Sequence, residues 1–284
     1  MSIVVTGATG QLGRLVVEEL LECGVDPAGI VATGRSIERL TELAERGVRV
    51  ERLDFSAVPE AVDWLGDGDV LLLVSGSELG RRVAQHAAVV DLAARSGVHR
   101  LVYTSAPAAD DTALVVAPEH AATERLIRDS GLRFTFLRNG WYTENYLTVF
   151  GQARETGVVA DSAGDGRVAS APRAEYAAAA AAVLTGDGHE GAVYELSGDA
   201  AWSFDELAQE FTEVLGREVT RSRFTPEAHR EALVSHGLDE GTAGFLVALD
   251  RNISDGLLAV TSGELAKLIG RPTTALAETV RGWA

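Results

Sequence analysis

Three glycines near the amino terminus have the spacing of a phosphate-binding turn. Gly7, Gly10 and Gly13 follow the apolar run 3–5 and open a stretch with apolar residues at helical spacing that ends near Gly24. After a strand, the first glycine permits a tight turn, the second lets the backbone approach a pyrophosphate, and the third lets the helix pack closely. The free N–H groups and positive dipole end of the helix then hold the phosphates. This context favours a nucleotide site over a purely structural turn.

The residues after the second expected strand indicate which nucleotide binds. An NAD site usually carries an acidic residue there, which bonds the ribose 2′-hydroxyl. This chain has Thr33, Gly34 and Arg35 instead, and an arginine fork suits a 2′-phosphate. We therefore expect NADP(H), with an exposed turn arginine as the alternative. Asp54 is expected to meet the adenine amino group or to cap the next short helix.

Strands that alternate with helices must position these residues. The expected strands are 3–5, 30–33, 48–53, 70–74, 101–104 and 134–137, and the expected helices are 37–46, 81–96 and 119–130. Such alternation predicts βαβ units and a parallel sheet. The run 70–74 is apolar on both faces, as a central parallel strand should be. We expect an α/β fold with a Rossmann-like doubly wound parallel sheet.

The βα rhythm loosens after residue 146. We expect an NADP-binding Rossmann domain at 1–146, to which residues 174–196 return. The remaining residues, 147–173 and 197–284, are expected to form a smaller α+β lid or substrate region. Within it, Ser203 and Glu206 form a capping pattern that predicts a helix ending at Leu215.

Composition excludes several classes of protein. The formal net charge of −17 disfavours nucleic acid and anionic membrane, and no apolar run approaches the about 18 residues of a membrane span. Cys23 is the one cysteine, so neither an internal disulfide nor a cysteine-based zinc site is expected. His229 and His236 have unconvincing spacing for a metal, and we expect none. We expect a soluble, cytoplasmic protein because no signal peptide is visible.

Several further segments carry a resemblance to a known family. They are 6–13, 72–78, 103–105, 119–120, 137–146, 163–170, 191–199 and 268–274. The chain resembles the NmrA-like branch of the atypical short-chain dehydrogenase/reductases. Within that branch it is similar to the type 2 NAD(P)H:quinone oxidoreductases, bacterial enzymes without a flavin. The block 139–146 is the most specific part of these segments and the glycine turn the least.

The resemblance implies a set of cofactor-binding residues. Gly7, Ala8, Thr9, Gly10, Gln11 and Leu12 would hold the pyrophosphate, and Arg35 the adenine-side phosphate. Ser75, Gly76 and Ser77 would line the ribose and nicotinamide side, and Asn139, Gly140, Trp141 and Tyr142 would border the nicotinamide. Arg173 would contact a phosphate or pair with an acid. Independently, ligands of doubly wound sheets lie beyond the carboxyl ends of the strands.

The chain departs from related reductases at the proton donor. Typical members use Tyr-x-x-x-Lys with an upstream serine, but the only lysine here is Lys267, in a C-terminal helical pattern. Ser105 remains, while His120 and Glu124 take the other two positions. His120 could donate a proton near neutral pH with Glu124 orienting it, and an ordinary surface pair is the alternative. With Tyr142, Ser105 and His120 are the candidate catalytic residues.

The absence of the usual tyrosine and lysine proton donor indicates which class of substrate the site could reduce. A ketone needs its developing alkoxide protonated or held, whereas a quinone becomes a delocalised aromatic anion and needs little acid from the protein. Trp141, Tyr142 and Tyr146 offer flat apolar surfaces for such a ring, with core packing as the alternative. We expect an NADPH-dependent, flavin-free quinone reductase that transfers hydride directly to a small quinone. The rival is a non-catalytic NADP(H)-sensing regulator, and a homodimer is one option for the oligomeric state.

Overall fold

The computed structural model describes residues 1–284, which form two compact units. The first unit comprises residues 1–110, 118–139 and 173–195, and the second comprises 111–117, 140–172 and 196–284. Residues 111–117 and 140–146, which the sequence suggested for the first domain, thus belong to the second unit. Leu114 and Ala117 enter its hydrophobic core, and Asn252 binds the backbone of Ala113 and Val115.

A seven-stranded sheet forms the centre of the first unit, in the order β11-β6-β5-β4-β1-β2-β3. The strands are β1 (Ile3–Val5), β2 (Ile30–Gly34), β3 (Arg49–Arg52), β4 (Val70–Leu73), β5 (Arg100–Ser105), β6 (Phe134–Asn139) and β11 (Val193–Leu196). β1 pairs in parallel with both β2 and β4, so the strand order reverses beside it. The expected Rossmann-like sheet is confirmed, and ligands of such sheets bind where the order reverses.

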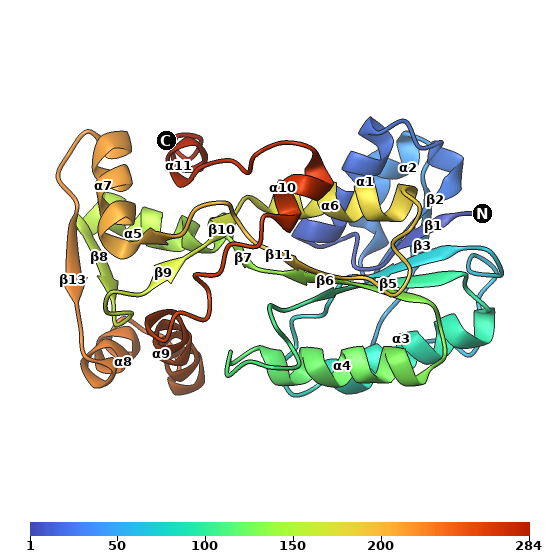
Figure 1. Cartoon of the computed structure of the whole chain (residues 1–284), viewed down its shortest axis with the longest axis horizontal. Coiled ribbons are helices and arrows are strands. Elements are labelled where there is room, and N and C mark those ends of the chain that lie inside the picture. Colours follow the sequence, from blue (N-terminus) through green and yellow to red (C-terminus); the bar gives the residue numbers. More distant parts are fainter. The chain divides into compact units, whose positions relative to one another are not determined.

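Helices cover both faces of this sheet (Figure 1). One face carries α1 (Gln11–Glu22), α2 (Thr41–Glu45) and α6 (Arg173–Thr185), and the other carries α3 (Arg82–Ser96) and α4 (Ala117–Asp129). The alanine-rich α6 packs against α1, because its small side chains allow a close approach. Short 3-10 turns, η1 (Pro27–Gly29) and η2 (Ile37–Leu40), flank β2. In the core, Tyr103 and Phe136 are fully buried and meet edge to face.

The second unit combines short strand pairs with helices. Its elements are β7 (Trp141–Tyr142), η3 (Thr143–Tyr146), α5 (Leu147–Thr156), β8 (Val158–Asp161), β9 (Arg167–Val168), β10 (Ser170–Ala171), β12 (Trp202–Ser203), α7 (Phe204–Leu215), β13 (Thr220–Arg223), α8 (Pro226–Ser235), α9 (Glu240–Ser254), α10 (Glu264–Ile269) and α11 (Leu276–Arg281). β7 pairs with β10, β12 with β9, and β13 with β8. The predicted capping box of Ser203 and Glu206 opens α7, which sets its apolar face against the core.

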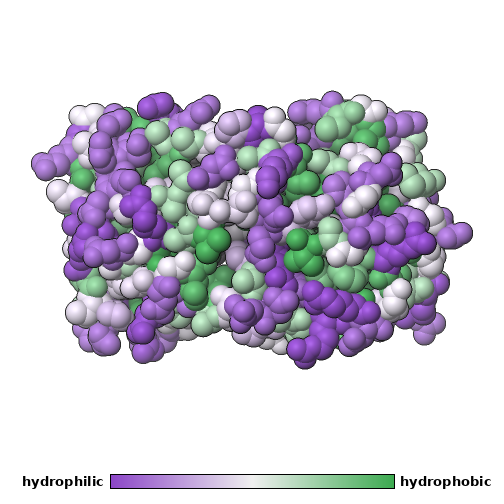
Figure 2. Space-filling model, in the orientation of Figure 1, coloured by the Kyte–Doolittle hydropathy of each residue, from purple (hydrophilic) through white to green (hydrophobic).

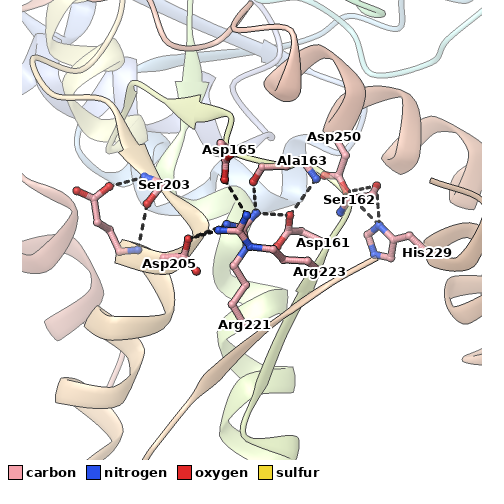
Figure 3. Close-up of polar contacts among 12 residues, drawn as sticks. Asp161, Ser162, Ala163, Asp165, Ser203, Asp205, Arg221, Arg223, His229 and Asp250 are labelled. Atoms are coloured by element: carbon pink, nitrogen blue, oxygen red, sulfur yellow. Dashed lines mark hydrogen bonds and ion pairs between the residues drawn. The ribbon is translucent and has the colours of Figure 1, made fainter. Parts of the chain in front are cut away.

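Buried charges join the elements of the second unit (Figure 3). Arg221 on β13 donates to both oxygens of Asp161 at the end of β8, at 2.7 Å each, and to Asp205 on α7 at 2.9 Å. Asp161 is only 1% exposed, and a two-point arginine–carboxylate pair of this kind is strong and directional. This pairing therefore holds β8, β13 and α7 in register.

A serine, a histidine and an aspartate also meet in this unit, but not as a catalytic triad. Nδ1 of His229 lies 3.0 Å from Asp250 and 3.1 Å from the Ser162 hydroxyl, which itself donates to Asp250 at 2.8 Å (Figure 3). In a triad the acid and the nucleophile contact opposite ring nitrogens. Here both contact the same nitrogen, so the group serves to tie α8 and α9 to the end of β8.

Hydrophilic residues dominate the face drawn in Figure 2, with hydrophobic residues interspersed among them. None of the helices combines the length and the apolar character needed to span a bilayer.

Candidate functional site

The glycine turn has the geometry that its sequence predicts. Gly7 adopts a φ of +62°, and the amide of Gly10 donates to the Gly7 carbonyl at 2.9 Å. A Cβ at Gly13 would lie 2.5 Å from the Gly7 carbonyl oxygen, so only glycine allows α1 to approach the turn this closely. The first amides of α1 have no acceptor within the helix and so remain for a ligand.

Two details of this turn were not apparent from the sequence. The amide of Ala8 is not available to a phosphate, because it donates to the carbonyl of Thr33 at 2.8 Å. Gly34 is also required, since a Cβ there would lie 2.5 Å from the Thr9 side chain. Its position directly before Arg35 was the one available signal.

Arg35 and Asp54 follow β2 and β3 at the same edge of the sheet. Arg35 is exposed and donates to Glu78 at 3.1 Å. Asp54 accepts the amide of Ser56 at 2.9 Å and closes a turn. No helix begins there, so the expectation of a helix cap at Asp54 is wrong.

The loop that contains Ser75, Gly76 and Ser77 is held in place by α3 and β5. The amide of Gly76 donates to Nε2 of His86 at 3.0 Å, and its carbonyl accepts from Nε of Arg82 at 2.6 Å. The amide of Ser75 donates to the Thr104 hydroxyl at 2.8 Å. Both peptide groups of Gly76 therefore have fixed partners.

Burial keeps two histidines beneath this loop neutral. His86 accepts the Gly76 amide at Nε2, which places its proton on Nδ1, 3.0 Å from the Thr123 hydroxyl. Nδ1 of His120 lies 2.7 Å from the Tyr103 hydroxyl. Burial, with Arg82 nearby, lowers the pKa of each histidine from 6.5 to about 3. His120 is therefore uncharged near neutral pH and cannot act as an imidazolium acid, so the expectation of such an acid there is wrong.

Glu124 does not orient His120 either. Fully buried, it accepts from the Ser105 hydroxyl at 2.7 Å and from Arg138 at 2.8 and 2.9 Å. The expected His120–Glu124 pair is wrong because Arg138, 14 residues away in sequence, provides the stronger partner. The Ser105 hydroxyl hydrogen is likewise engaged with Glu124.

Arg138 also anchors the loop that follows β5. It binds Glu195 at 2.9 Å and Asp110 at 2.8 Å, and its hydrogen bond lowers the pKa of Asp110. Glu195 in turn accepts the amide of Ala108 at 3.0 Å. Ala108 is the one residue other than glycine with a positive φ, +44°, so these charges hold a strained backbone in place.

The expected site residues are divided between the two units. The first unit contains the glycine turn, Arg35, Asp54, the Ser75–Ser77 loop, Ser105, His120, Asn139 and Arg173. Asn139 is buried at the end of β6, and Arg173 is half-buried at the start of α6. Gly140, Trp141, Tyr142 and Tyr146 belong to the second unit, where Trp141 and Tyr142 are half-buried in β7.

Tyr146 does not offer its ring to a ligand. It is 6% exposed and packs edge to face on Trp202, with ring centres 4.8 Å apart, and on Phe204. Burial raises the pKa of its hydroxyl. The expectation of a substrate surface at Tyr146 is wrong, because the ring is part of the core of the second unit.

A family model described as NAD(P)H-binding matches residues 7–187. The chain belongs to this NAD(P)H-binding family. The match runs from the glycine turn through α6, and so includes the three strand ends that carry Arg35, Asp54 and the Ser75–Ser77 loop. The resemblance that the sequence motifs carried is confirmed.

The similarity to relatives extends over nearly the whole chain. Quinone oxidoreductase 2 of Escherichia coli (strain K12) is 45% identical over 278 residues, which cover 98% of this chain and 97% of that protein. A crystal structure of an NADPH-dependent quinone oxidoreductase from Escherichia coli, complexed with NADPH, matches with a TM-score of 0.93 and 46% identity, covering 99% of each chain. Triphenylmethane reductase of Citrobacter sp., complexed with NADP(H), matches at a TM-score of 0.93 and 38% identity over 100% of each chain.

Proposed function

We propose that this chain is an NADPH-dependent quinone reductase that needs no flavin and no metal. One observation carries the proposal: in the unit that holds the dinucleotide cradle, neither Ser105 nor His120 is arranged as an acid catalyst. Ser105 donates to Glu124, and His120 is neutral. The similarity to a quinone oxidoreductase over nearly the full length supports the same reading.

The residues present fit a phosphorylated dinucleotide. A Cβ would fill the space at Gly13, and the first turn of α1 offers free amides and the positive end of its dipole. Within residues 7–12, the amides at the start of α1 would hold the pyrophosphate, since those of Ala8 and Gly10 have other acceptors. Arg35 would bind a 2′-phosphate, and Asp54 would lie near the adenine. Further contacts to the ribose and nicotinamide would come from the following residues: Ser75, Gly76, Ser77, Asn139, Gly140, Trp141 and Tyr142. Arg173 would contact a phosphate or pair with an acid.

The choice of substrate follows from what these side chains do. Bound NADPH supplies a hydride. The chain positions the acceptor and excludes water, which brings the reactants together without acid catalysis. A quinone suits this arrangement, because the anion that it forms is aromatic and takes its proton from water. Trp141 and Tyr142 would stack on the quinone ring, since aromatic side chains favour flat apolar partners.

Steady-state kinetics with and without the Arg35 side chain tests this proposal. We expect the protein, free of flavin, to oxidise NADPH with 1,4-benzoquinone or a naphthoquinone, and added flavin to leave the rate unchanged. Arg35→Ala should raise KM for NADPH about tenfold, equivalent to the loss of one charged hydrogen bond, and leave KM for NADH unchanged. Arg46→Ala, at another exposed arginine of the same unit, is the control. Tight NADPH binding without turnover would instead favour the regulator.

A further inference from the structure

The guanidinium expected to meet the 2′-phosphate already has a carboxylate partner. Oε1 of Glu78, in the loop between β4 and α3, lies 3.1 Å from Nη1 of Arg35. We propose that Glu78 lowers the selectivity for NADP(H) by competing with its 2′-phosphate for Arg35. The inference rests on the proposed function for the placement of that phosphate, and it adds a residue that opposes the binding of the phosphate.

Glu78 is held in this position by two residues at the start of α3, its N-cap Arg81 and Gln85 in its first turns. Its second carboxylate oxygen accepts from Nε2 of Gln85 at 3.0 Å and from Arg81 at 3.3 Å. Gln85 is buried and also donates to the Ser56 hydroxyl at 3.0 Å. The carboxylate is therefore oriented by a buried side chain, which distinguishes it from a mobile surface acid.

The backbone that carries Glu78 is anchored as well. The amide of Arg82 donates to the Glu78 carbonyl at 2.9 Å, and the side chain of Arg82 binds both the Gly76 carbonyl and Glu119. Glu119 also accepts the amide of Gly80 at 2.8 Å. Because the loop is fixed before and after Glu78, its carboxylate stays near Arg35 unless the side chain itself rotates.

NADP(H) and NAD(H) would interact differently with the Arg35–Glu78 ion pair. A 2′-phosphate on Arg35 comes within the screening length of the Glu78 carboxylate, about 8 Å at physiological salt, and is repelled by it. The 2′-hydroxyl of NAD(H) is instead a donor that a carboxylate can accept. Glu78 therefore weakens NADP(H) binding and supports NAD(H) binding. It thereby reduces the preference for NADP(H) over NAD(H) that Arg35 creates.

Calorimetry with coenzyme fragments tests the proposal without any quinone. The probes are adenosine 2′,5′-bisphosphate, which carries the 2′-phosphate, and adenosine 5′-monophosphate, which does not. Glu78→Gln keeps the shape of the side chain and removes its charge. It should tighten the bisphosphate about two- to fivefold, the size of an exposed charge interaction, and leave the monophosphate unchanged or weaker. Glu45→Gln is the matched control, since Glu45 is exposed on α2 and loses the same charge.

Repeating the Glu78→Gln measurement in the Arg35→Ala variant shows whether the gain in bisphosphate affinity depends on Arg35. There, Glu78→Gln should change the affinity for the bisphosphate no more than Glu45→Gln does. The proposal is overturned if the two glutamate variants behave alike with Arg35 present, if the gain persists without Arg35, or if the bisphosphate does not bind. A protein that shows the predicted gain but reduces no quinone would refute the proposed function and leave this inference standing.

Discussion

At the scale of single residues, Gly13 gives the sharpest test of the nucleotide cradle. An alanine inside a helix normally stabilises it relative to glycine by about 1 kcal/mol. At Gly13 the added methyl would lie 2.5 Å from a backbone oxygen, which cannot move without opening the turn. We predict that Gly13→Ala destabilises the fold by about 1–3 kcal/mol and weakens NADPH binding at least about tenfold, measured by urea unfolding and by nicotinamide fluorescence.

Gly29→Ala is the control for that experiment. A Cβ at Gly29 meets nothing within 4 Å, and its φ is not positive. It should therefore leave NADPH affinity unchanged. Equal affinities for the Gly13→Ala and Gly29→Ala variants would remove the structural basis of the cradle.

The buried histidines predict how stability depends on pH. His120 is neutral when folded, with its pKa lowered from 6.5 to about 3, so between these values the unfolded chain binds a proton that the folded chain does not. The free energy of unfolding should thus fall as pH falls from 6.5 towards 3, by about 1.4 kcal/mol per pH unit from His120. In urea titrations across this range, His120→Gln should reduce the slope by that amount. His236→Gln, at an exposed histidine, should leave the slope unchanged. An unchanged slope in His120→Gln would contradict the conclusion that folded His120 has a lowered pKa.

Some residue roles could be predicted from the sequence, and others depended on contacts distant along the chain. Gly7 and Gly13 follow a local pattern, so their geometry could be read from spacing. The ion pair between Arg35 and Glu78 spans 43 residues, and the contact between Glu124 and Arg138 joins a helix to a strand. Neither has a local signature, which is why His120 was wrongly matched with Glu124.

At the scale of elements, Arg138 is the side chain that joins β6 to α4 and to the loop after β5. Arg138→Met would leave Glu124 buried without its main counter-charge, and breaking a buried pair in this way costs about 3–5 kcal/mol. Arg133→Met removes an exposed pair with Glu190 and should cost less than about 1 kcal/mol. Urea denaturation of the two variants checks the difference in their free energies of unfolding. A loss in Arg138→Met as small as that expected for Arg133→Met would show that the Arg138 network does not stabilise the sheet.

Elements marked by an apolar run or a capping pair were predictable. A short strand at 167–170 could also be predicted, but its division into β9 and β10 could not. The apolar run 70–74 gave β4, and Ser203 with Glu206 gave the start of α7, because the determining residues are adjacent in sequence. The two-residue strands β7, β9, β10 and β12 have no periodicity of their own. They form because partners elsewhere in the chain accept their backbone hydrogen bonds, as β10 does for β7.

At the scale of the whole molecule, a chain with a net charge of −17 is proposed to bind a polyanionic coenzyme. The general field opposes this binding, so the affinity must come from local groups: the amides at the start of α1 and the side chain of Arg35. The doubly wound sheet could be predicted from the alternation of strands and helices, whereas the order of its strands required the structure. Assigning residues 111–117 to the second unit required the structure, because Leu114 and Ala117 find their core partners far along the chain.

Hydride transfer without flavin is the central claim, and one measurement tests it most directly. Purified protein that shows no flavin absorbance is mixed anaerobically with 1,4-benzoquinone and either NADPH or NADPH deuterated at the transferred position, and the single turnover is followed at the nicotinamide band. We predict that nicotinamide oxidation matches hydroquinone formation one for one and is slower with the deuterated coenzyme. Turnover that begins only after flavin is added, or no turnover above the rate without protein, would contradict the account.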